Sequence, residues 1–358
     1  MNSNSISYTT VDQQISKLES QNLIIENRDY AAECLLLYGY SNLIKSYREP
    51  YMITEGDKKV FRSGVTFGQI CSLYILDKAL RNSVMASMLD LEEHIKEAAA
   101  DTIAKSFGVH QDDYLKFSNY RNKRKRKRQF TLPGILDTMK DTINTSKNPI
   151  YHYRTAHNVV PPWILFKSIY FSTIVNFIDL FKTSEKTEVA HRIYDNSKLR
   201  LSNQELCQLM MDTLYLCLDY RNIAAHGGRT YNYISPNRIR IQQINERSIQ
   251  NNVPGFSQLL FLLDLIRYAA PILRLKETLT SELNRHCSRF PQDITYLGQV
   301  LNINIITRDI VYVSEKSHKY HRNPHCSGIQ NVAEIPIEDA MSKGYLPCKR
   351  CCKEIQVS

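Results

Sequence analysis

The chain lacks several features that would assign it to a class at once. Its 358 residues hold a single tryptophan, no internal repeat and no low-complexity linker. Residues 1–10 are polar and lack the basic and then apolar pattern of a signal peptide, so we expect a cytoplasmic protein. Charged residues interrupt the two most apolar windows, 163–181 and 259–275, which favours buried helices and no association with membranes.

Cysteine is present, but its spacing is irregular. Nine cysteines without a secretion signal argue against a disulfide framework. Five of them fall in apolar helical patterns and are expected to be small core residues: Cys34, Cys71, Cys207, Cys217 and Cys287. The other four crowd the last 33 residues, which indicates a separate role for that region.

The net charge of +10 comes mostly from one segment, which we call the basic run. Residues 121–128 hold seven basic side chains and no acid, which leaves +3 for the rest of the chain. Like charges at this density repel along a helix, so we expect a loop or a frayed helix end. The run is either a solvated surface loop or an arm that contacts RNA phosphates without reading sequence. Its basic residues are Arg121, Lys123, Arg124, Lys125, Arg126, Lys127 and Arg128.

Helical spacing of apolar residues dominates the chain, so we predict a mainly α fold. The longest helical pattern covers residues 66–107, where Asp77 and Arg81, and likewise Glu92 and Lys96, stand four apart and can form ion pairs. Another pattern begins with a capping box at Ser202, carries a buried stripe and stops at two glycines, 227–228. Pro271 is expected to kink a later helix, and the single tryptophan, Trp163, is expected to anchor the core.

The helix that ends at the glycine pair carries a cluster of polar residues at its end. At about 100° per residue, positions four apart share a face, whereas positions five apart point about 140° away from each other. Asn222 and His226 therefore share a face. Arg221 must reach round the helix to join them, or a second chain must complete the site. In the alternative interpretation, His226 caps the last carbonyls and Arg221 makes a structural ion pair.

The same cluster has the groups needed to cleave RNA without a metal. Histidine can move protons near neutral pH, which suits His226 to the 2′-hydroxyl and the leaving oxygen. The guanidinium of Arg221 suits the charge that develops on phosphate, and Asn222 could orient the imidazole or hold a phosphate oxygen. Arg229 and Tyr231, just past the helix end, are candidates for contacting the RNA backbone or stacking on a base.

The Arg-x4-His pattern resembles the active-site motif of HEPN ribonucleases. The wider string RN-x-x-AH-x-x-R-x-YN at residues 221–232, with the Pro-x-Trp segment before it, resembles the abortive-infection (Abi) branch over residues 10–285. The resemblance implies a HEPN-like helical bundle and a metal-independent endoribonuclease that acts as a toxin in bacterial phage defence. It also implies a homodimer that pairs two motifs, with an RNA or protein antitoxin as a candidate partner. Asp77, Arg81 and Glu92 match family positions whose role the sequence does not give.

Two other functions stay open at the level of sequence. One is a non-catalytic RNA-binding regulator on the same scaffold, controlled by an RNA or protein antitoxin. The other is a zinc-dependent DNA-binding or repair factor, although no helix-turn-helix signature supports it. We predict two domains, an Abi-like helical region at residues 1–300 and a small α+β zinc module at residues 306–358.

The predicted zinc module rests on two close pairs of ligand residues. Cys348-x2-Cys351 follows His321-x4-Cys326 by about 22 residues, the arrangement of a tetrahedral structural Zn²⁺ site. A segment this small has little core of its own, so metal binding would supply folding energy. His325 is a rival for the histidine ligand and Cys352 for Cys351. The string also resembles the Ada-type zinc-binding domain, from which it departs by one extra residue between His321 and Cys326.

Overall fold

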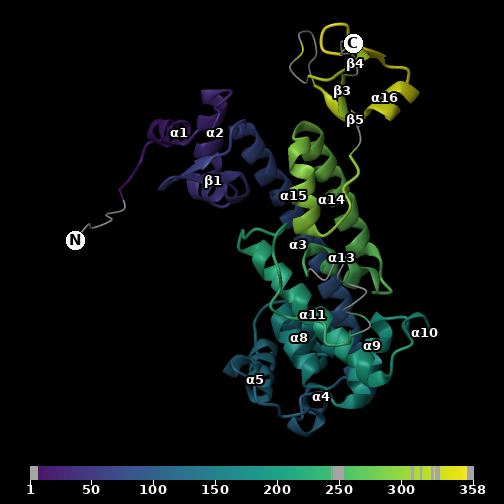
Figure 1. Ribbon diagram of the computed structural model, residues 1–358. Helices are drawn as coiled ribbons and strands as arrows, with labels where there is room; N and C mark the ends of the chain where they lie inside the picture. Colours follow the sequence, from purple (N-terminus) through teal and green to yellow (C-terminus); the bar gives the residue numbers. More distant parts are fainter. Residues whose placement is uncertain are drawn as a thin grey trace. The chain divides into compact units, whose positions relative to one another are not determined.

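The computed structural model describes residues 7–242, 244, 254–307, 310–314, 317–323, 326 and 331–352 (Figure 1). Helices dominate this part of the chain, and strands concentrate near its C-terminal end, which confirms the predicted mainly α fold with a small α+β region. Within the described residues, no helix has both the length and the apolarity to cross a membrane.

The chain divides into two compact units, and each is described by itself. Unit 1 comprises Met1–Ala79, Thr278–Gln299 and Ile303–Ser358. Unit 2 comprises Leu80–Glu277 and Val300–Asn302. The long helix α3 (Phe67–Phe107) supplies residues to both units. The predicted domain boundary between residues 300 and 306 remains a prediction.

Unit 1 begins with two short helices and a hairpin. Its helical elements besides the start of α3 are α1 (Val11–Ser20), α2 (Arg28–Tyr38), η1 (Ser41–Lys45), η2 (Glu49–Tyr51), the end of α14 (Ala270–Arg289), η7 (Pro291–Asp293), most of α15 (Ile294–Leu301) and α16 (Ile337–Ser342). The hairpin pairs β1 (Met52–Glu55) with β2 (Lys58–Phe61) in antiparallel register.

The C-terminal part of unit 1 folds around a small sheet in the order β5-β3-β4-β6. Its strands are β3 (Ile310–Ser314), β4 (Ser317–His321), β5 (Ala333–Pro336) and β6 (Leu346–Pro347). β3 is antiparallel to both β4 and β5, whereas β4 and β6 are parallel. In the described residues, its apolar core has four buried members, Val311, Val313, Tyr320 and Ala340, and four partly buried residues pack against them, Ile335, Ile337, Tyr345 and Cys352. A core this small gives little stability by itself.

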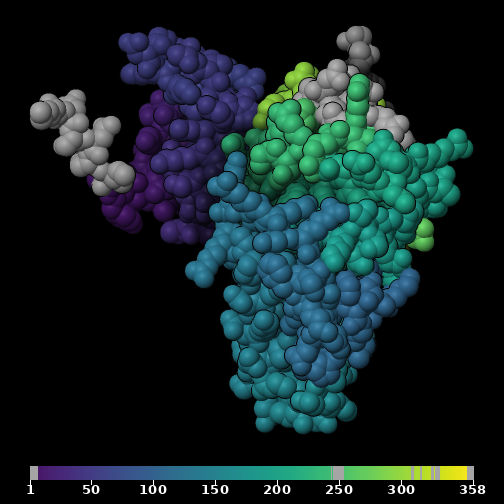
Figure 2. All heavy atoms as spheres, turned by 90° about the horizontal axis from the view of Figure 1, so that it is seen from below, coloured from purple at the N-terminus to yellow at the C-terminus, as the bar shows by residue number. Residues whose placement is uncertain are grey.

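Unit 2 is built almost wholly of helices. Besides the rest of α3 and the start of α14, its elements are α4 (Gln111–Tyr114), η3 (Phe117–Asn119), η4 (Arg128–Phe130), α5 (Leu132–Ile143), α6 (Ile150–His157), α7 (Pro162–Leu165), η5 (Phe166–Ser168), α8 (Phe171–Asp179), α9 (Thr183–Ile193), α10 (Asn196–Leu199), α11 (Asn203–Ala225) and α13 (Phe256–Asp264). Helix α11 packs on α8, α9 and α13 (Figure 1). In the space-filling view, the blue and teal residues of this unit form one continuous body of packed atoms (Figure 2).

Helix α11 forms as its sequence predicts. The Ser202 hydroxyl accepts the Glu205 N–H while the Glu205 side chain accepts the Ser202 N–H, which confirms the capping box. The predicted stripe is fully buried in the core: Leu206, Met210, Leu214 and Cys217. Because one face is held by α8 and α9, the position of the helix end is fixed by core packing.

Two expectations about apolar segments are wrong. Trp163 keeps 38% of its surface exposed, so it is not a core anchor. Pro271 does not kink a continuous helix, because the segment breaks between α13 and α14 and the proline lies in the first turn of α14. A proline is tolerated there since the first-turn N–H groups have no partner within the helix.

Candidate functional site

The polar cluster predicted from sequence lies at the C-terminal end of α11. His226 is the capping residue, and Gly227 follows in the left-handed conformation with φ of 70°. The Gly227 N–H donates to the Ala224 carbonyl at 3.2 Å and the Gly228 N–H to the Ile223 carbonyl at 2.9 Å. This pair of bonds is the Schellman motif that satisfies the last helical carbonyls. His226 is therefore held by a rigid helix end.

Three side chains of the cluster are arranged around this end. Arg221 and Asn222 are half-buried, and His226 is exposed. The Arg221 Nη1 donates to the Asn222 Oδ1 at 3.4 Å, so the long side chain reaches toward its neighbour's amide. Asn222 and His226 are four residues apart and share a face of the helix. That Arg221 reaches round the helix to join His226 stays a prediction.

A second helix holds the end of α11. The side chain of Arg81, on α3, is almost fully buried, and its Nη1 donates to the Gly227 carbonyl at 3.1 Å. A cation at this place satisfies a carbonyl and also complements the negative end of the helix dipole. The sequence singled out Arg81 without giving it a role, and the structure assigns it to the end of α11.

The segment after the motif folds back along α11, which the sequence did not predict. The carboxylate of Asp219 accepts hydrogen bonds from the Ser235 hydroxyl at 2.6 Å and the Asn237 amide at 2.7 Å. Two turns further from the motif, the buried Asp212 carboxylate accepts from the Arg240 N–H and Nε, both at 2.8 Å. The sequence signal for this fold-back is the pair of acids spaced seven apart along one helix, because such spacing puts both carboxylates on one face.

The two residues expected to contact RNA past the helix end differ in exposure. Arg229 is exposed, as such a contact requires. Tyr231 is fully buried, so in this arrangement its ring cannot stack on a base. The prediction for Tyr231 is wrong because a tyrosine that follows a helix closely is as suited to packing under it as to standing on the surface.

The basic run is a loop, as expected, that leads into η4. Part of it is bound to the body of unit 2. Lys123 contacts the Asp179 carboxylate at 3.1 Å, and Lys125 and Lys186 also pair with this carboxylate. Burial alone would raise the pKa of Asp179, but the three lysines lower it well below its usual range. Lys123 and Lys125 are therefore paired to protein.

The remaining cations of the run are exposed side chains: Arg121, Arg124, Arg126, Lys127 and Arg128. Lys125 also lies 3.3 Å from the Tyr215 hydroxyl on α11. Tyr215 precedes Asn222 by seven residues, which puts the two about 20° apart around the helix and about 10 Å apart along it. The basic run is thus tied to the face of α11 that carries Asn222 and His226.

The Abi-like protein family is matched over residues 33–232, which is more than half of the chain. The chain belongs to this family. The match ends at Asn232, the last residue of the motif, and includes both Arg81 and the basic run. Separate searches of curated proteins and of solved structures found no match.

Within the matched region of this Abi-like protein, Glu92 and Trp163 border a cavity of about 600 Å³. Glu92 pairs with Lys96 at 2.6 Å, which confirms the predicted i,i+4 pair, and both side chains are largely buried. The half-exposed indole of Trp163 lies in the cavity wall with Leu89, Glu97 and Lys167. The acid and the tryptophan that the family resemblance singled out thus meet at one cavity.

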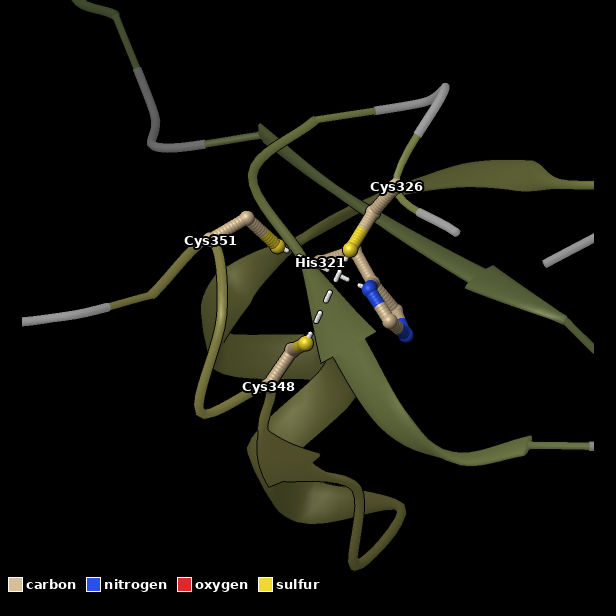
Figure 3. Close-up of side chains that lie close together, drawn as sticks. All are labelled: His321, Cys326, Cys348 and Cys351. Carbon is tan, nitrogen blue, oxygen red and sulfur yellow. Dashed lines mark hydrogen bonds between the residues drawn. The ribbon is translucent and has the colours of Figure 1, made fainter. Parts of the chain in front are cut away.

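Outside the matched region, the Abi-like protein carries a compact cluster of metal-ligand side chains. The ligand atoms of His321, Cys326, Cys348 and Cys351 all lie within 4.8 Å of one another. The Cys326 and Cys348 sulfurs are 3.9 Å apart, and the Cys351 sulfur is 3.6 Å from the His321 Nδ1. Tetrahedral Zn²⁺ with usual bond lengths sets its ligand atoms about 3.5–3.8 Å apart. The four side chains point to a common centre (Figure 3) and could hold such an ion.

The neighbourhood of the cluster bears on the rival ligands. The Cys352 sulfur contacts the Tyr320 carbonyl at 3.5 Å, and its side chain packs on the small apolar core, so Cys351 is the residue of this pair that joins the cluster. His325 lies outside the described residues. Backbone N–H groups of Cys351 and Arg350 lower the pKa of the Cys348 thiol to about 7, which favours the thiolate that metals bind.

Proposed function

We propose that this Abi-like protein is a metal-independent endoribonuclease of the HEPN type that acts as a toxin in anti-phage defence. The observation that carries the proposal is the rigid end of α11, where Arg221 lies beside Asn222 and His226 is exposed. Membership of the Abi-like family supports the defence role, because the match includes the whole motif.

In the proposed reaction, the RNA 2′-hydroxyl attacks the adjacent phosphorus. An imidazole of His226 takes the 2′-hydroxyl proton, and a protonated imidazole gives a proton to the leaving 5′-oxygen. The guanidinium of Arg221 stabilises the extra negative charge of the phosphorane, and Asn222 orients the imidazole or holds a phosphate oxygen. Such a reaction leaves a 2′,3′-cyclic phosphate and a 5′-hydroxyl.

A complete site needs one group that accepts a proton and another that donates one. One chain supplies a single Arg-x4-His motif of this kind, with one exposed histidine at the end of α11. We infer that two copies of the chain bring two motifs together in a homodimer. An open, exposed helix end is suited to receiving the second motif.

RNA is the substrate that the charge pattern supports. Lys125 of the basic run contacts Tyr215, on the face of α11 that carries Asn222 and His226, the run has further cations that are exposed, and Arg229 is exposed just past the helix end. Phosphate contacts by such side chains position a strand without reading its sequence. An RNA or protein antitoxin that covers this cationic surface would inhibit cleavage.

The C-terminal cluster is proposed to hold a structural Zn²⁺. Its four donors, one imidazole and three thiols, are the set that Zn²⁺ prefers, and together they fill a tetrahedral shell. A filled shell leaves no position for water or substrate, so the ion would stabilise the fold of this region and take no part in cleavage.

The test is cleavage of single-stranded RNA by the full chain, followed on a gel with and without EDTA. We expect cleavage in EDTA with 2′,3′-cyclic phosphate ends, and a loss of about 10²–10⁴-fold in rate for His226→Ala. His157→Ala is the matched control, because His157 is also an exposed histidine in the last turn of a helix of unit 2. It should cleave at the wild-type rate.

The outcomes separate the candidate functions. Cleavage that is unchanged in His226→Ala would remove the site assignment. RNA that is bound but never cleaved, by a chain whose far-ultraviolet circular dichroism shows it folded, would favour the non-catalytic regulator.

A further inference from the structure

A chain of hydrogen-bonded side chains in unit 1 joins three residues that neither the RNA site nor the metal cluster uses. Ser72 lies in the second turn of α3, His286 near the end of α14, and Asp293 at the end of η7. The Ser72 Oγ is 2.9 Å from the His286 Nδ1, and the His286 Nε2 is 2.9 Å from the Asp293 Oδ2. Serine, histidine and aspartate thus lie in contact in the order of a catalytic triad.

Asp293 is held as a carboxylate by its surroundings. It is buried, with Oδ2 also accepting from the Tyr51 hydroxyl at 2.8 Å and Oδ1 from the Gln69 amide at 2.9 Å. Burial opposes its ionisation, but the hydrogen bonds from His286, Gln69 and Tyr51 lower the pKa of Asp293 below its usual value. A carboxylate can only accept hydrogen bonds.

The carboxylate fixes the proton on the imidazole of His286. Because Asp293 only accepts, the His286 Nε2 must carry the proton of that hydrogen bond, which leaves the Nδ1 of a neutral ring with a lone pair. The Ser72 hydroxyl is then the donor in its bond to Nδ1. This is the arrangement in which a histidine can take a serine proton.

Ser72 is reachable, whereas the base behind it is shielded. The imidazole of His286 is 1% exposed, and Ser72 is half-buried. Both border a cavity of about 580 Å³ whose wall also includes Tyr30, Arg285 and Arg289. That volume lies in the range of about 300–1,000 Å³ that small-molecule sites occupy.

The cavity wall has both polar and apolar side chains and is close to neutral in charge. Three arginines border it, among them Arg285 and Arg289, and three glutamates border it, among them Glu282 and Glu334. Arg285 Nε donates to the Glu334 carboxylate at 3.0 Å, and Arg289 Nη2 donates to its other oxygen at 2.7 Å. Guanidinium groups can stabilise an oxyanion, and the balance of charge favours a small polar substrate of low net charge.

We propose that Ser72, His286 and Asp293 form a nucleophilic triad that hydrolyses a small carboxylic ester in this cavity. The Ser72 Oγ bonds to the carbonyl carbon while its proton passes to the His286 Nδ1. The ester C–O bond then breaks, and the alcohol leaves with that proton. Water attacks the acyl-serine, gives a proton to His286, and the acid leaves as the proton returns to Ser72. Asp293 holds the imidazole in position throughout and does not touch the substrate.

A triad and a merely structural network predict different chemistry. In a structural network, Ser72 reacts no faster than any other serine. In a triad, the Oγ is activated only while the three groups are assembled. Fluorophosphonates report this difference, because an activated serine displaces fluoride from phosphorus and keeps the phosphonyl group.

The experiment treats the full chain with a fluorophosphonate and locates the adduct by peptide mass spectrometry. We expect one adduct, on Ser72, that fails to form in Ser72→Ala and forms at least about 100-fold more slowly in His286→Gln and Asp293→Asn. Ser106→Ala is the matched control, since Ser106 is an exposed serine of the same helix, and its labelling should equal that of wild type. The rate of p-nitrophenyl acetate hydrolysis should fall in the same three variants.

A variant that misfolds does not weaken the test, because wild-type chain in denaturing urea serves as the unassembled state. Labelling of Ser72 that disappears in urea supports the triad. The proposal is overturned by the absence of an adduct on Ser72 in the folded chain, or by equal labelling of folded wild type and folded His286→Gln. Neither result bears on RNA cleavage, which rests on other residues.

Discussion

The end of α11 and the C-terminal cluster each use a histidine, but they differ in completeness. At the cluster, four donors lie within 4.8 Å of one another and three of them are buried. At the end of α11, the histidine is exposed, and its chain offers no second motif of the kind. The first arrangement is closed and needs only an ion, whereas the second is open and, on the proposed mechanism, needs another chain.

The difference has a physical cause: local sequence determines the position of the metal ligands within each pair, whereas assembly of two chains determines whether the helix ends meet. Ligand pairs spaced a few residues apart must lie close together in any fold of the C-terminal strands. The approach of two helix ends depends on the surfaces of whole units. Substitutions in the cluster should therefore act on folding, and substitutions at the end of α11 should act on reaction.

The largest effect is expected from loss of a metal ligand. Cys348→Ser should reduce bound zinc from one ion per chain to none and unfold β3 and β4, because the described apolar core there has four buried residues. In small zinc-binding peptides the ion contributes about 10–16 kcal/mol of apparent free energy at neutral pH. Zinc is measured by atomic absorption and the strands by hydrogen exchange.

Cys352→Ser is the control for this prediction. Its sulfur contacts a backbone carbonyl and lies outside the cluster, so the variant should keep its zinc and its protected strands. Loss of zinc from this variant but not from Cys348→Ser would mean that the ligands are wrongly assigned.

The next effect concerns the open site and its partner. Arg221→Ala and His226→Ala should each lose about 10²–10⁴-fold in RNA cleavage while keeping wild-type unfolding curves. The proposed reaction needs a proton acceptor and a proton donor from two motifs, so a pocket contains His226 of both chains. Mixing wild type with an excess of His226→Ala should therefore lower the cleavage rate per wild-type chain, because mixed dimers lack one of the two histidines. Cleavage is followed before and after the subunits are allowed to exchange.

Wild type mixed with the same excess of His157→Ala is the control, because the motif of that variant is intact and the cleavage rate per chain should not fall. Should excess His226→Ala leave the cleavage rate per wild-type chain unchanged while mixed dimers form, the two motifs do not share a pocket.

Sequence was sufficient for the elements whose cause is local. The capping box at Ser202, the buried stripe of α11, the glycine stop and each of the two candidate ligand pairs in the C-terminal cluster depend on spacings of a few residues. The mainly α class followed from helical periodicity over long stretches. None of these needs knowledge of which elements meet in space.

Long-range contacts explain what sequence could not provide. Arg81 lies 146 positions before Gly227, so its bond to that carbonyl appears in no local pattern. The exposure of Tyr231 and Trp163 also depends on long-range contacts. Aromatic residues suit both core and surface, and only the packed fold decides between them.

A smaller effect is expected from the basic run, where the structure separates paired cations from exposed ones. Replacing Arg124, Arg126, Lys127 and Arg128 with glutamine should reduce the salt dependence of RNA binding by about 3 in the log–log slope, since each single-strand phosphate contact contributes about 0.7. Replacing Lys123 and Lys125 should change that slope little, because Asp179 already pairs with both. Equal slope changes in the two sets of variants would show that exposed and Asp179-paired cations contribute alike to RNA binding.

The smallest effect concerns how firmly the open site is held before RNA arrives. Arg81→Met keeps the bulk of the side chain but removes the bond to the Gly227 carbonyl, so we expect a loss of about 1–2 kcal/mol in the free energy of unfolding. Lys105→Met is the control on the same helix, because its exposed ion pair with Glu188 should contribute less than about 1 kcal/mol. Urea unfolding measures both variants.

If Arg81 also positions His226, cleavage by Arg81→Met should fall further than the fraction of unfolded chain explains. A cleavage rate that only follows the folded fraction would make Arg81 a contributor to stability alone, and the end of α11 would then keep its geometry through the glycine stop.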